Sequence, residues 1–284
     1  MGNNFIKIFM LVLLTNFGIN NIYAQREEIT IKYDTVTVPK TRTLRLAKVR
    51  SVPKFILHFN ASYNSGAMEL TSHNGGFYRE DFLSGKNFSV RHGFGANLIG
   101  KLPLNKKGNF WLDIIAGFDR FQSNLFVVNT KEGKVSYNSI NGGVGVEYNF
   151  TPTHKVKYYF GLNPLFSVIS GKASLINPDN NQIDINIKSS LRIGYSAFFG
   201  LEYAFEKNFG LNLGLKFTHA NLFLKKSEEA VQESEASSNV GLNDDAVTEE
   251  SGIQFAGWKQ FAYFSGSVGF SYFFSVKERK YKLP

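Results

Sequence analysis

The chain has 284 residues, with 26 glycines and 28 phenylalanines but only 7 prolines and no cysteine. Without cysteine, a disulfide framework, a thiolate metal site and a thiol nucleophile are excluded. The formal net charge of +9 is spread along the chain and gathers in no recognisable nucleic-acid-binding module, so we expect no nucleic-acid partner. Abundant glycine and aromatic residues with little proline favour one repetitive β architecture.

Residues 1–24 have the three parts of a secretory signal peptide. Lys7 supplies the positive region, Ile8–Leu14 begins an apolar core, and Ile22-Tyr23-Ala24 is a usable cleavage site. The apolar run is too short for a bilayer-spanning helix, which needs about 20 residues. The alternative is an ordinary buried helix. We therefore expect a secreted precursor.

Residues 25–53 are predicted to form an N-terminal arm in the periplasm. Ile29–Tyr33 and Thr35–Pro39 alternate well enough for short strands, and a basic stretch follows them. We expect an extended arm. The alternative is a docking strand that adds to the sheet edge of a periplasmic partner.

The rest of the chain repeats one pattern, in which apolar and polar residues alternate with a period of two. This period is typical of strands whose two faces differ. Eight segments carry it: 55–63, 90–98, 110–118, 140–150, 158–166, 191–203, 211–217 and 264–274. Their polar faces are rich in glycine, serine and asparagine, which suit a narrow lumen. We therefore predict an all-β, antiparallel, up-and-down transmembrane β-barrel of about eight strands over residues 54–274, with a soluble β-sandwich or lipocalin-like barrel as the alternative.

Connection lengths orient this predicted barrel. Short connections (103–108, 151–154 and 206–208) alternate with longer ones (65–87, 125–134, 169–185 and 223–258). Membrane barrels have short periplasmic turns and longer outer loops, so both termini are expected in the periplasm. The predicted outward aromatic residues then gather at the periplasmic strand ends, where a membrane interface favours aromatic rings. The same parity points the polar side chain of His92 towards lipid, so His92 is expected either near the outer interface or at a bulge that shifts the register.

The last segment carries the residues of a family resemblance. Ser267, Gly269, Tyr272 and Phe274 have the spacing polar, any, glycine, two of any, aromatic, any, aromatic. By this pattern and by its topology, the chain over 54–274 resembles the small Gram-negative outer-membrane β-barrels of the OmpA/OmpX-like eight-stranded type. The resemblance implies that the barrel-insertion machinery reads these four residues as an assembly signal.

The chain departs from many members of that family, which end on the last aromatic residue. Residues 275–284 continue as a basic tail that we expect in the periplasm. These residues are too few for a peptidoglycan-binding domain of the OmpA type, so that activity is not expected.

Charged residues on the predicted inward face form two layers. The set comprises Arg91, Asp113, Asp119, Glu147, Arg192, Glu202 and Lys216, joined at the periplasmic end by Lys101 and Lys157. An unpaired charge in a narrow lumen is costly, so we expect ion pairs across it. The network is predicted to plug and stiffen the barrel, and the alternative is a gated pore or a proton path.

Sequence motifs for catalysis are lacking. None of the five histidines lies in a nucleophile motif, and His219 with Ser265 on neighbouring strands is the one candidate dyad. Neither a phosphate-binding glycine loop nor a convincing metal-ligand spacing appears. We therefore expect no catalytic site, no metal and no cofactor.

The longest outer loop, 223–258, is strongly acidic. Between Ser227 and Gly252 it holds eight acidic residues and no basic one. Low hydrophobicity with charge of one sign predicts a solvated, disordered surface loop. The alternative is a site for divalent cations that bridge lipopolysaccharide, although the spacing matches no calcium loop.

Together these features predict an integral outer-membrane barrel with a structural or surface-interaction role. Its expected partners are outer-membrane lipid and lipopolysaccharide, besides the insertion machinery. The alternatives are a narrow channel or transport accessory, a lipid-modifying barrel enzyme, and a soluble periplasmic binding protein.

Overall fold

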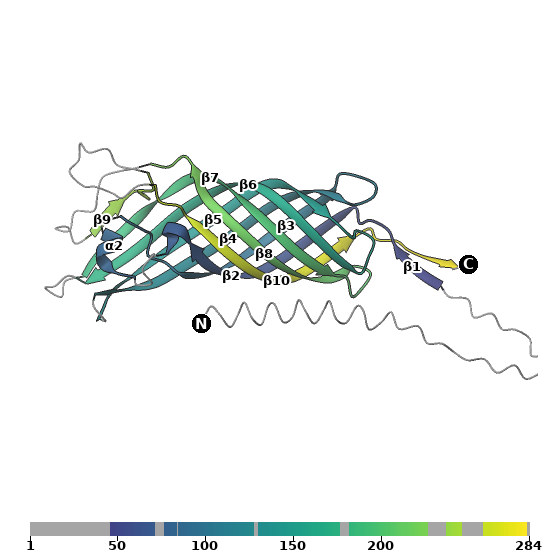
Figure 1. Ribbon diagram of the computed structural model, residues 1–284, viewed down its shortest axis with the longest axis horizontal. Coiled ribbons are helices and arrows are strands. Elements are labelled where there is room, and N and C mark those ends of the chain that lie inside the picture. Colours follow the sequence, from purple (N-terminus) through teal and green to yellow (C-terminus); the bar gives the residue numbers. More distant parts are fainter. Residues whose placement is uncertain are drawn as a thin grey trace, which may run out of the picture. The chain divides into compact units, whose positions relative to one another are not determined.

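The computed structural model describes residues 46–71, 77–83, 85–127, 130–176, 182–226, 237–245 and 258–282. Most of these residues lie in strands (Figure 1). Within them, no helix is long and apolar enough to cross a bilayer. The predicted signal peptide and most of the predicted arm lie outside the described residues.

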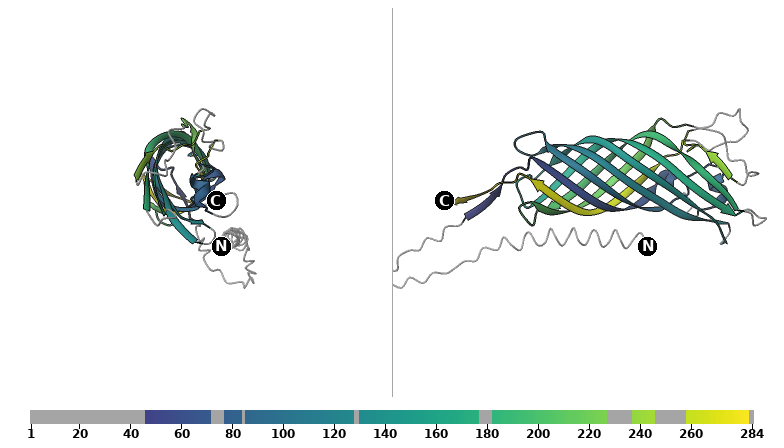
Figure 2. Two further views of the ribbon diagram at one scale, coloured as in Figure 1. Left: turned by 90° about the vertical axis from the view of Figure 1, so that its left-hand side faces the viewer. Right: turned by 180° about the vertical axis from the view of Figure 1, so that it is seen from behind.

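Eight antiparallel strands form a closed ring (Figures 1 and 2). They are β2 (Phe55–Ala67), β3 (His92–Pro103), β4 (Phe110–Val127), β5 (Thr130–Asn149), β6 (Val156–Ile176), β7 (Gln182–Tyr203), β8 (Phe209–Phe223) and β10 (Ala262–Phe274). Each pairs with the next ring strand in the chain, and β10 pairs with β2 to complete the circle. A closed ring satisfies its backbone groups internally and leaves no ring edge for lipid to meet. The predicted up-and-down architecture is confirmed.

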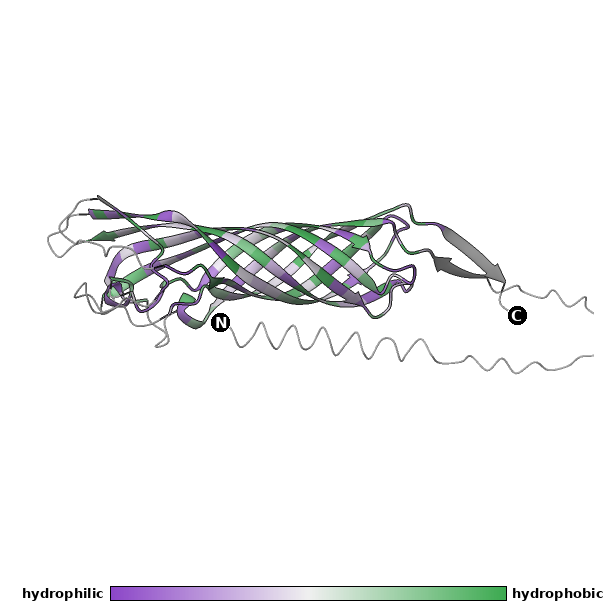
Figure 3. Cartoon of the chain, turned by 90° about the horizontal axis from the view of Figure 1, so that it is seen from above, coloured by the Kyte–Doolittle hydropathy of each residue, from purple (hydrophilic) through white to green (hydrophobic). Residues whose placement is uncertain are grey.

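Side chains alternate between the outside and the inside of the ring. Hydrophobic and hydrophilic residues accordingly alternate along its strands (Figure 3). Large apolar side chains on the outside stay exposed, with Phe94 70% and Phe270 62% accessible. The inside is narrow, because a Cβ at Gly95 would collide with the Asp119 carboxylate and the Ser62 hydroxyl. A continuous apolar exterior around a polar interior inverts the pattern of a soluble barrel and faces lipid. The soluble alternative is therefore rejected.

We call the end with the β3–β4, β5–β6 and β7–β8 connections the turn end, and the opposite end the loop end. Aromatic rings surround the turn end, as the sequence predicts. Phe110 packs edge-on against Tyr148 with ring centroids 5.0 Å apart. Tyr272 and Phe274 lie 4.6 Å apart, and Phe274 reaches Phe55 across the β10–β2 seam at 5.3 Å. Such a girdle suits a membrane interface.

The outward face changes character along β4–β7. The last apolar row is Phe118, Ile140, Val168 and Leu191, which are aligned across the four strands. Further towards the loop end, every outward residue of the next three rows is polar. We call these twelve residues the polar wall: Arg120, Gln122, Asn124, Lys134, Ser136, Asn138, Ser170, Lys172, Ser174, Asp184, Asn186 and Lys188.

The inward face makes the opposite change at the same level. Beyond the boundary it is apolar and buried, with Phe121, Tyr137, Ile169 and Ile187 as examples. Such a face needs a cover, and two connections supply it. We call them the cap: residues 68–71, 77–83 and 85–91, with η1 (Met68–Leu70) and α2 (Arg79–Leu83), and residues 237–245 with 258–261, where β9 (Ser237–Val240) pairs in parallel with β7.

The cap fills the loop end with a packed core. Leu70, Phe88 and Val90 come from its first part, and Val240, Leu242 and Phe261 from its second. All of them are buried, and they pack against the inward apolar side chains of β4–β7. The ring thus has a polar interior where its exterior meets lipid, and an apolar interior where its exterior is polar.

The turn end is extended by a two-stranded ribbon (Figure 1). β1 (Leu46–Arg50) pairs antiparallel with β11 (Glu278–Lys282). The Ser51 amide donates to the Lys277 carbonyl at 2.9 Å, so the ribbon continues the β10–β2 ladder. The end of the predicted arm and the basic tail therefore leave the ring together. Trp111, Phe273 and Val276 belong to a small apolar cluster that fills the ring at this end.

Two of the expected outer loops are largely strand, which corrects the sequence interpretation. β4 and β5 extend to Val127 and from Thr130, through the expected loop at 125–134. β6 and β7 likewise occupy most of 169–185. The alternation continues in these stretches, but the apolar residues move from the outward to the inward parity. A search for strands with apolar outward faces therefore stops at the boundary.

A pair of charge insertions tests the boundary. Ile114→Lys places an ammonium in the lipid-facing zone and should lower the free energy of unfolding by about 2–4 kcal/mol. Gln122→Lys lies on the same face of β4 beyond the boundary and should cost at most about 1 kcal/mol. Urea titration of the protein folded in lipid vesicles measures both. Equal costs would contradict the assigned boundary.

Candidate functional site: the lumen and its cap

A layer of buried charges crosses the lumen near the turn end. The Lys157 ammonium donates to Glu202 at 2.6 Å, and His58 Nε2 lies 2.7 Å from the other oxygen of the same carboxylate. The Lys101 ammonium bonds to Glu147. All five side chains are almost fully buried. Lys157 faces Glu202 directly across the β6–β7 pair, so strand register itself creates the contact.

Aromatic faces complete the environment of both ammonium groups. Lys101 Nζ lies 4.0 Å from the centre of the Tyr159 ring, and Lys157 Nζ lies 4.3 Å from that of Phe273. A desolvated cation–π contact of this kind offsets part of the cost of burying a cation. Asp113 faces Lys101 across the β3–β4 pair, but neither of its carboxylate oxygens accepts a hydrogen bond from the described residues.

A second polar layer centres on Asp119. Its carboxylate accepts hydrogen bonds from Asn64 Nδ2 at 2.6 Å, Asn141 Nδ2 at 2.9 Å and the Tyr263 hydroxyl at 2.7 Å. Ser167 supports Asn141 by donating to its Oδ1 at 2.7 Å. Three neutral donors thus stabilise one buried carboxylate, whereas the sequence predicts pairing with a cation at this height.

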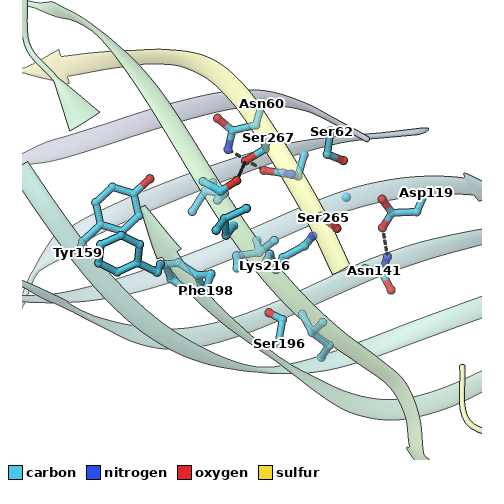
Figure 4. A pocket seen from close by; sticks show the side chains of 18 residues that line it. Asn60, Ser62, Asp119, Asn141, Tyr159, Ser196, Phe198, Lys216, Ser265 and Ser267 are labelled. Atoms are coloured by element: carbon cyan, nitrogen blue, oxygen red, sulfur yellow. Dashed lines mark hydrogen bonds between the residues drawn. The ribbon is translucent and has the colours of Figure 1, made fainter. Parts of the chain in front are cut away.

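A cavity of about 50 Å³ lies inside the ring (Figure 4). Its polar lining includes Asn60, Ser62, Ser196, Lys216 and Ser265. One enclosed water needs roughly 10–15 Å³ of such space, so the cavity has room for only a few. Side-chain oxygens of the first three and of Ser265 are buried and have no partner among the described residues, which makes them suitable hydrogen-bonding groups for such waters.

A buried ion pair fastens the cap to the ring. Arg192 on β7 donates from Nε and Nη2 to the two oxygens of Asp244 at 2.8 and 2.7 Å. Asn221 on β8 adds a bond at 2.8 Å, and the Lys226 amide one at 3.1 Å. Burial lowers the pKa of the Lys259 ammonium nearby to about 8, although the Asp244 carboxylate acts in the opposite direction. We call the Arg192–Asp244 pair the latch.

The latch corrects the interpretation of the acidic loop. Asp244 belongs to the segment predicted to be solvated and disordered, yet it is fully buried against Arg192. The partners are 52 residues apart in the chain, so no local pattern reveals them. The other acidic residues of that loop, apart from Asp245, lie outside the described residues.

The structure places the predicted lumen residues as follows. Asp113, Asp119, Glu147, Arg192 and Glu202 are buried inside the ring. Lys216 points inward and lines the cavity, half-buried, with no ion pair or hydrogen bond to its ammonium among the described residues. Sequence reasoning did not single out His58 as a lumen partner, although its parity on β2 places it inward.

Arg91 is not in the lumen, which corrects the prediction. It is exposed, while its neighbour Val90 is fully buried in the cap core. Strand β3 begins only at His92, and Ser89 has a positive φ of 52°, so the alternation of β3 does not extend to residues 90 and 91. His92 faces outward, as its parity predicts, and its Nδ1 lies 2.6 Å from the Tyr63 hydroxyl.

The candidate dyad is not assembled. Ser265 points into the lumen opposite Lys216, whereas His219 pairs with Ala262 and its ring packs near Tyr195 on the other face of the sheet. Among the described residues, no group of three or more histidine, aspartate or glutamate side chains is arranged to hold a metal ion.

The four residues of the expected assembly signal lie on β10. Ser267 and Gly269 face inward, and Tyr272 and Phe274 face outward in the aromatic girdle. Their reading by the insertion machinery stays a prediction.

Comparison with known proteins finds likeness in fold. The sequence matches no family model and no curated protein. Neisserial surface protein A aligns with 79% of this chain and 99% of its own at 14% identity and a TM-score of 0.40. OprG from Pseudomonas aeruginosa covers 82% and 98% at 9% identity and 0.38. The outer membrane protease OmpT from Escherichia coli covers 82% and 99% at 9% identity and 0.36.

The protein has an outer-membrane β-barrel fold. Its own surface decides this, because a closed antiparallel ring with lipid-facing apolar residues and a polar lumen is the architecture of such barrels. The predicted resemblance and the predicted outer-membrane location agree with this fold. The likenesses above concern the arrangement of strands and carry no activity to this chain.

A double-mutant cycle tests the charge layer. Lys101→Met leaves the buried carboxylates of Glu147 and Asp113 without their cation, and should cost about 3–5 kcal/mol of unfolding free energy. Lys101→Met with Glu147→Gln should cost at least about 1 kcal/mol less than the sum of the two single changes. Lys106→Met, at an exposed turn position, serves as the control and should have almost no effect. Additive costs would contradict the pair.

Proposed function

We propose that this outer-membrane barrel is closed and non-catalytic, and that it acts through contacts of its exposed surface. The cap carries the proposal. Phe261 packs edge-on against Phe88 and Phe121, with ring centroids 5.3 and 5.5 Å apart, within the core that fills the loop end. A solute that entered the lumen would have to displace these rings and open the latch.

The part of the lumen near the turn end supports the same proposal. The paired charges near the turn end are almost fully buried, and the cavity of about 50 Å³ inside the ring has room for only a few waters. Charges that bond to each other across a lumen favour rigidity over ion passage, because a moving ion would have to break them. These buried ion pairs and the small cavity therefore count against the narrow-channel alternative.

A non-catalytic role is supported by the side chains themselves. The best candidate pair, His219 and Ser265, lies on opposite faces of the sheet. The buried His58 is engaged with Glu202 in the interior. OmpT is a protease, but the likeness to it is one of fold.

Planar-bilayer recording tests the proposal. Purified protein whose folding is verified by its heat-dependent gel mobility should produce no conductance steps. Asp244→Ala removes the carboxylate of the latch and leaves Arg192 buried without its partner, so we expect intermittent currents from this variant. Asp184→Ala, at an exposed position on β7, should remain silent.

Steady conductance by the unmodified protein would overturn the closed-barrel proposal. A silent Asp244→Ala variant with an unchanged stability would show that the latch does not hold the cap. Altered acyl chains in lipid extracts incubated with the purified protein would instead support the lipid-modifying alternative.

A further inference from the structure

The polar wall is an outward surface with an unusual composition for its position. Of its twelve residues, four are basic, one is acidic and seven are serine, asparagine or glutamine. It begins directly beyond the last lipid-facing row, Phe118–Ile140–Val168–Leu191. Contact with water alone does not favour basic over acidic side chains. Beside a phosphorylated and hydroxylated layer, however, basic side chains can bond to phosphates, and serine, asparagine and glutamine can bond to hydroxyls.

Three of the four basic groups of the wall are available for a partner. Arg120 on β4, Lys134 on β5 and Lys172 on β6 are exposed, and none lies within ion-pair distance of a carboxylate among the described residues. Among the twelve residues of the wall, Asp184 is the single carboxylate. It accepts hydrogen bonds from Gln182 and Ser174, and the charge of Lys172 reaches it only at longer range.

The height of the wall narrows the choice of partner. From Arg120 to Asn124 the wall follows about 13 Å of strand, at about 3.3 Å per residue, which is a height of about 10 Å for strands tilted by about 40°. The single phosphate layer of a phospholipid would meet only the first row. A partner that contacts all three rows must stand well above the acyl chains and carry both anionic groups and hydroxyls.

We propose that the polar wall binds the phosphorylated sugar headgroup of lipopolysaccharide in the outer leaflet. Arg120, Lys134 and Lys172 contact phosphates, and the serine, asparagine and glutamine side chains between them bond to sugar hydroxyls. The inference rests on the proposed surface role and on the expected orientation, with the loop end outside the cell. It gives the surface role a partner of defined chemistry.

A matched pair of triple variants tests the proposal. The wall variant carries Arg120→Gln, Lys134→Gln and Lys172→Gln. The control variant carries Lys106→Gln, Lys107→Gln and Lys155→Gln, which remove the same charge from exposed turn positions at the opposite end. Binding of purified lipopolysaccharide to each protein in neutral detergent is measured by fluorescence titration, after heat-dependent gel mobility has verified folding.

The wall variant should bind lipopolysaccharide at least about tenfold more weakly, since each of its three lost basic groups contributes about fivefold near an anionic layer. The control variant should change binding by less than about twofold, and added salt should weaken binding to the unmodified protein. Enzymatically dephosphorylated lipopolysaccharide should bind the unmodified protein as weakly as intact lipopolysaccharide binds the wall variant.

Equal binding by the wall variant and the unmodified protein would overturn the proposal, as would an equal loss in the control variant. Undiminished binding of dephosphorylated lipopolysaccharide would show that phosphate is not recognised. If phosphatidylglycerol micelles competed with lipopolysaccharide equally well, the wall would bind anionic lipids in general, and the proposed specificity for lipopolysaccharide would be wrong. If the triple variant does not fold, the three single changes carry the test. Bilayer recordings of the same samples report separately on the closed-barrel proposal.

Discussion

Strands β4–β7 each pass from one solvent to another, and the side chains that face outward must change with it. A closed ring satisfies its own backbone, so side-chain polarity alone decides what each stretch of the exterior meets. Up to the row that contains Phe118 and Ile140 the exterior is apolar, and beyond it the exterior is polar. Because strand side chains alternate, every residue with an outward side chain has neighbours that point inward. The inward side chains on the two sides of this boundary are stabilised in different ways.

The inward face differs in composition and in stabilisation on the two sides of the boundary. Within the lipid-facing zone the inward face is polar and cut off from bulk water, so its charges bond to each other or to neutral donors. Glu202 has both Lys157 and His58, and Asp119 has three neutral donors. Beyond the boundary the inward face is apolar and would be exposed in an open ring. The cap covers it, and the latch holds the cap where the two interiors meet.

Much of this was predictable from sequence. The period of two located all eight ring strands, set their parity, and placed the aromatic girdle at the turn end. It failed where the meaning of the pattern reversed. Ile183, Ile185 and Ile187 alternate with polar residues as in the other strands, but their apolar side chains face inward, whereas the sequence pattern predicts a loop there.

The remaining misses have physical causes of two kinds. Arg91 lies outside the lumen because β3 begins at His92, two residues after the predicted start at Val90, and the backbone turns at Ser89. Local alternation does not reveal this turn. Asp244 lies in a segment whose composition predicts disorder, and its partner Arg192 is distant in the sequence. Charge pairing inside a barrel depends on height and register together, so the sequence identified the participants more reliably than the pairs.

Depth-dependent quenching along β4 tests the reversal of polarity most directly. The chain has no cysteine, so single cysteines introduced at Ile114, Phe118, Gln122 and Asn124 can each carry one fluorophore on the outward face. In vesicles whose lipids carry quenchers on their acyl chains, labels at 114 and 118 should be strongly quenched, and labels at 122 and 124 should not. Strong quenching at all four positions would place the polar wall in lipid and contradict the account.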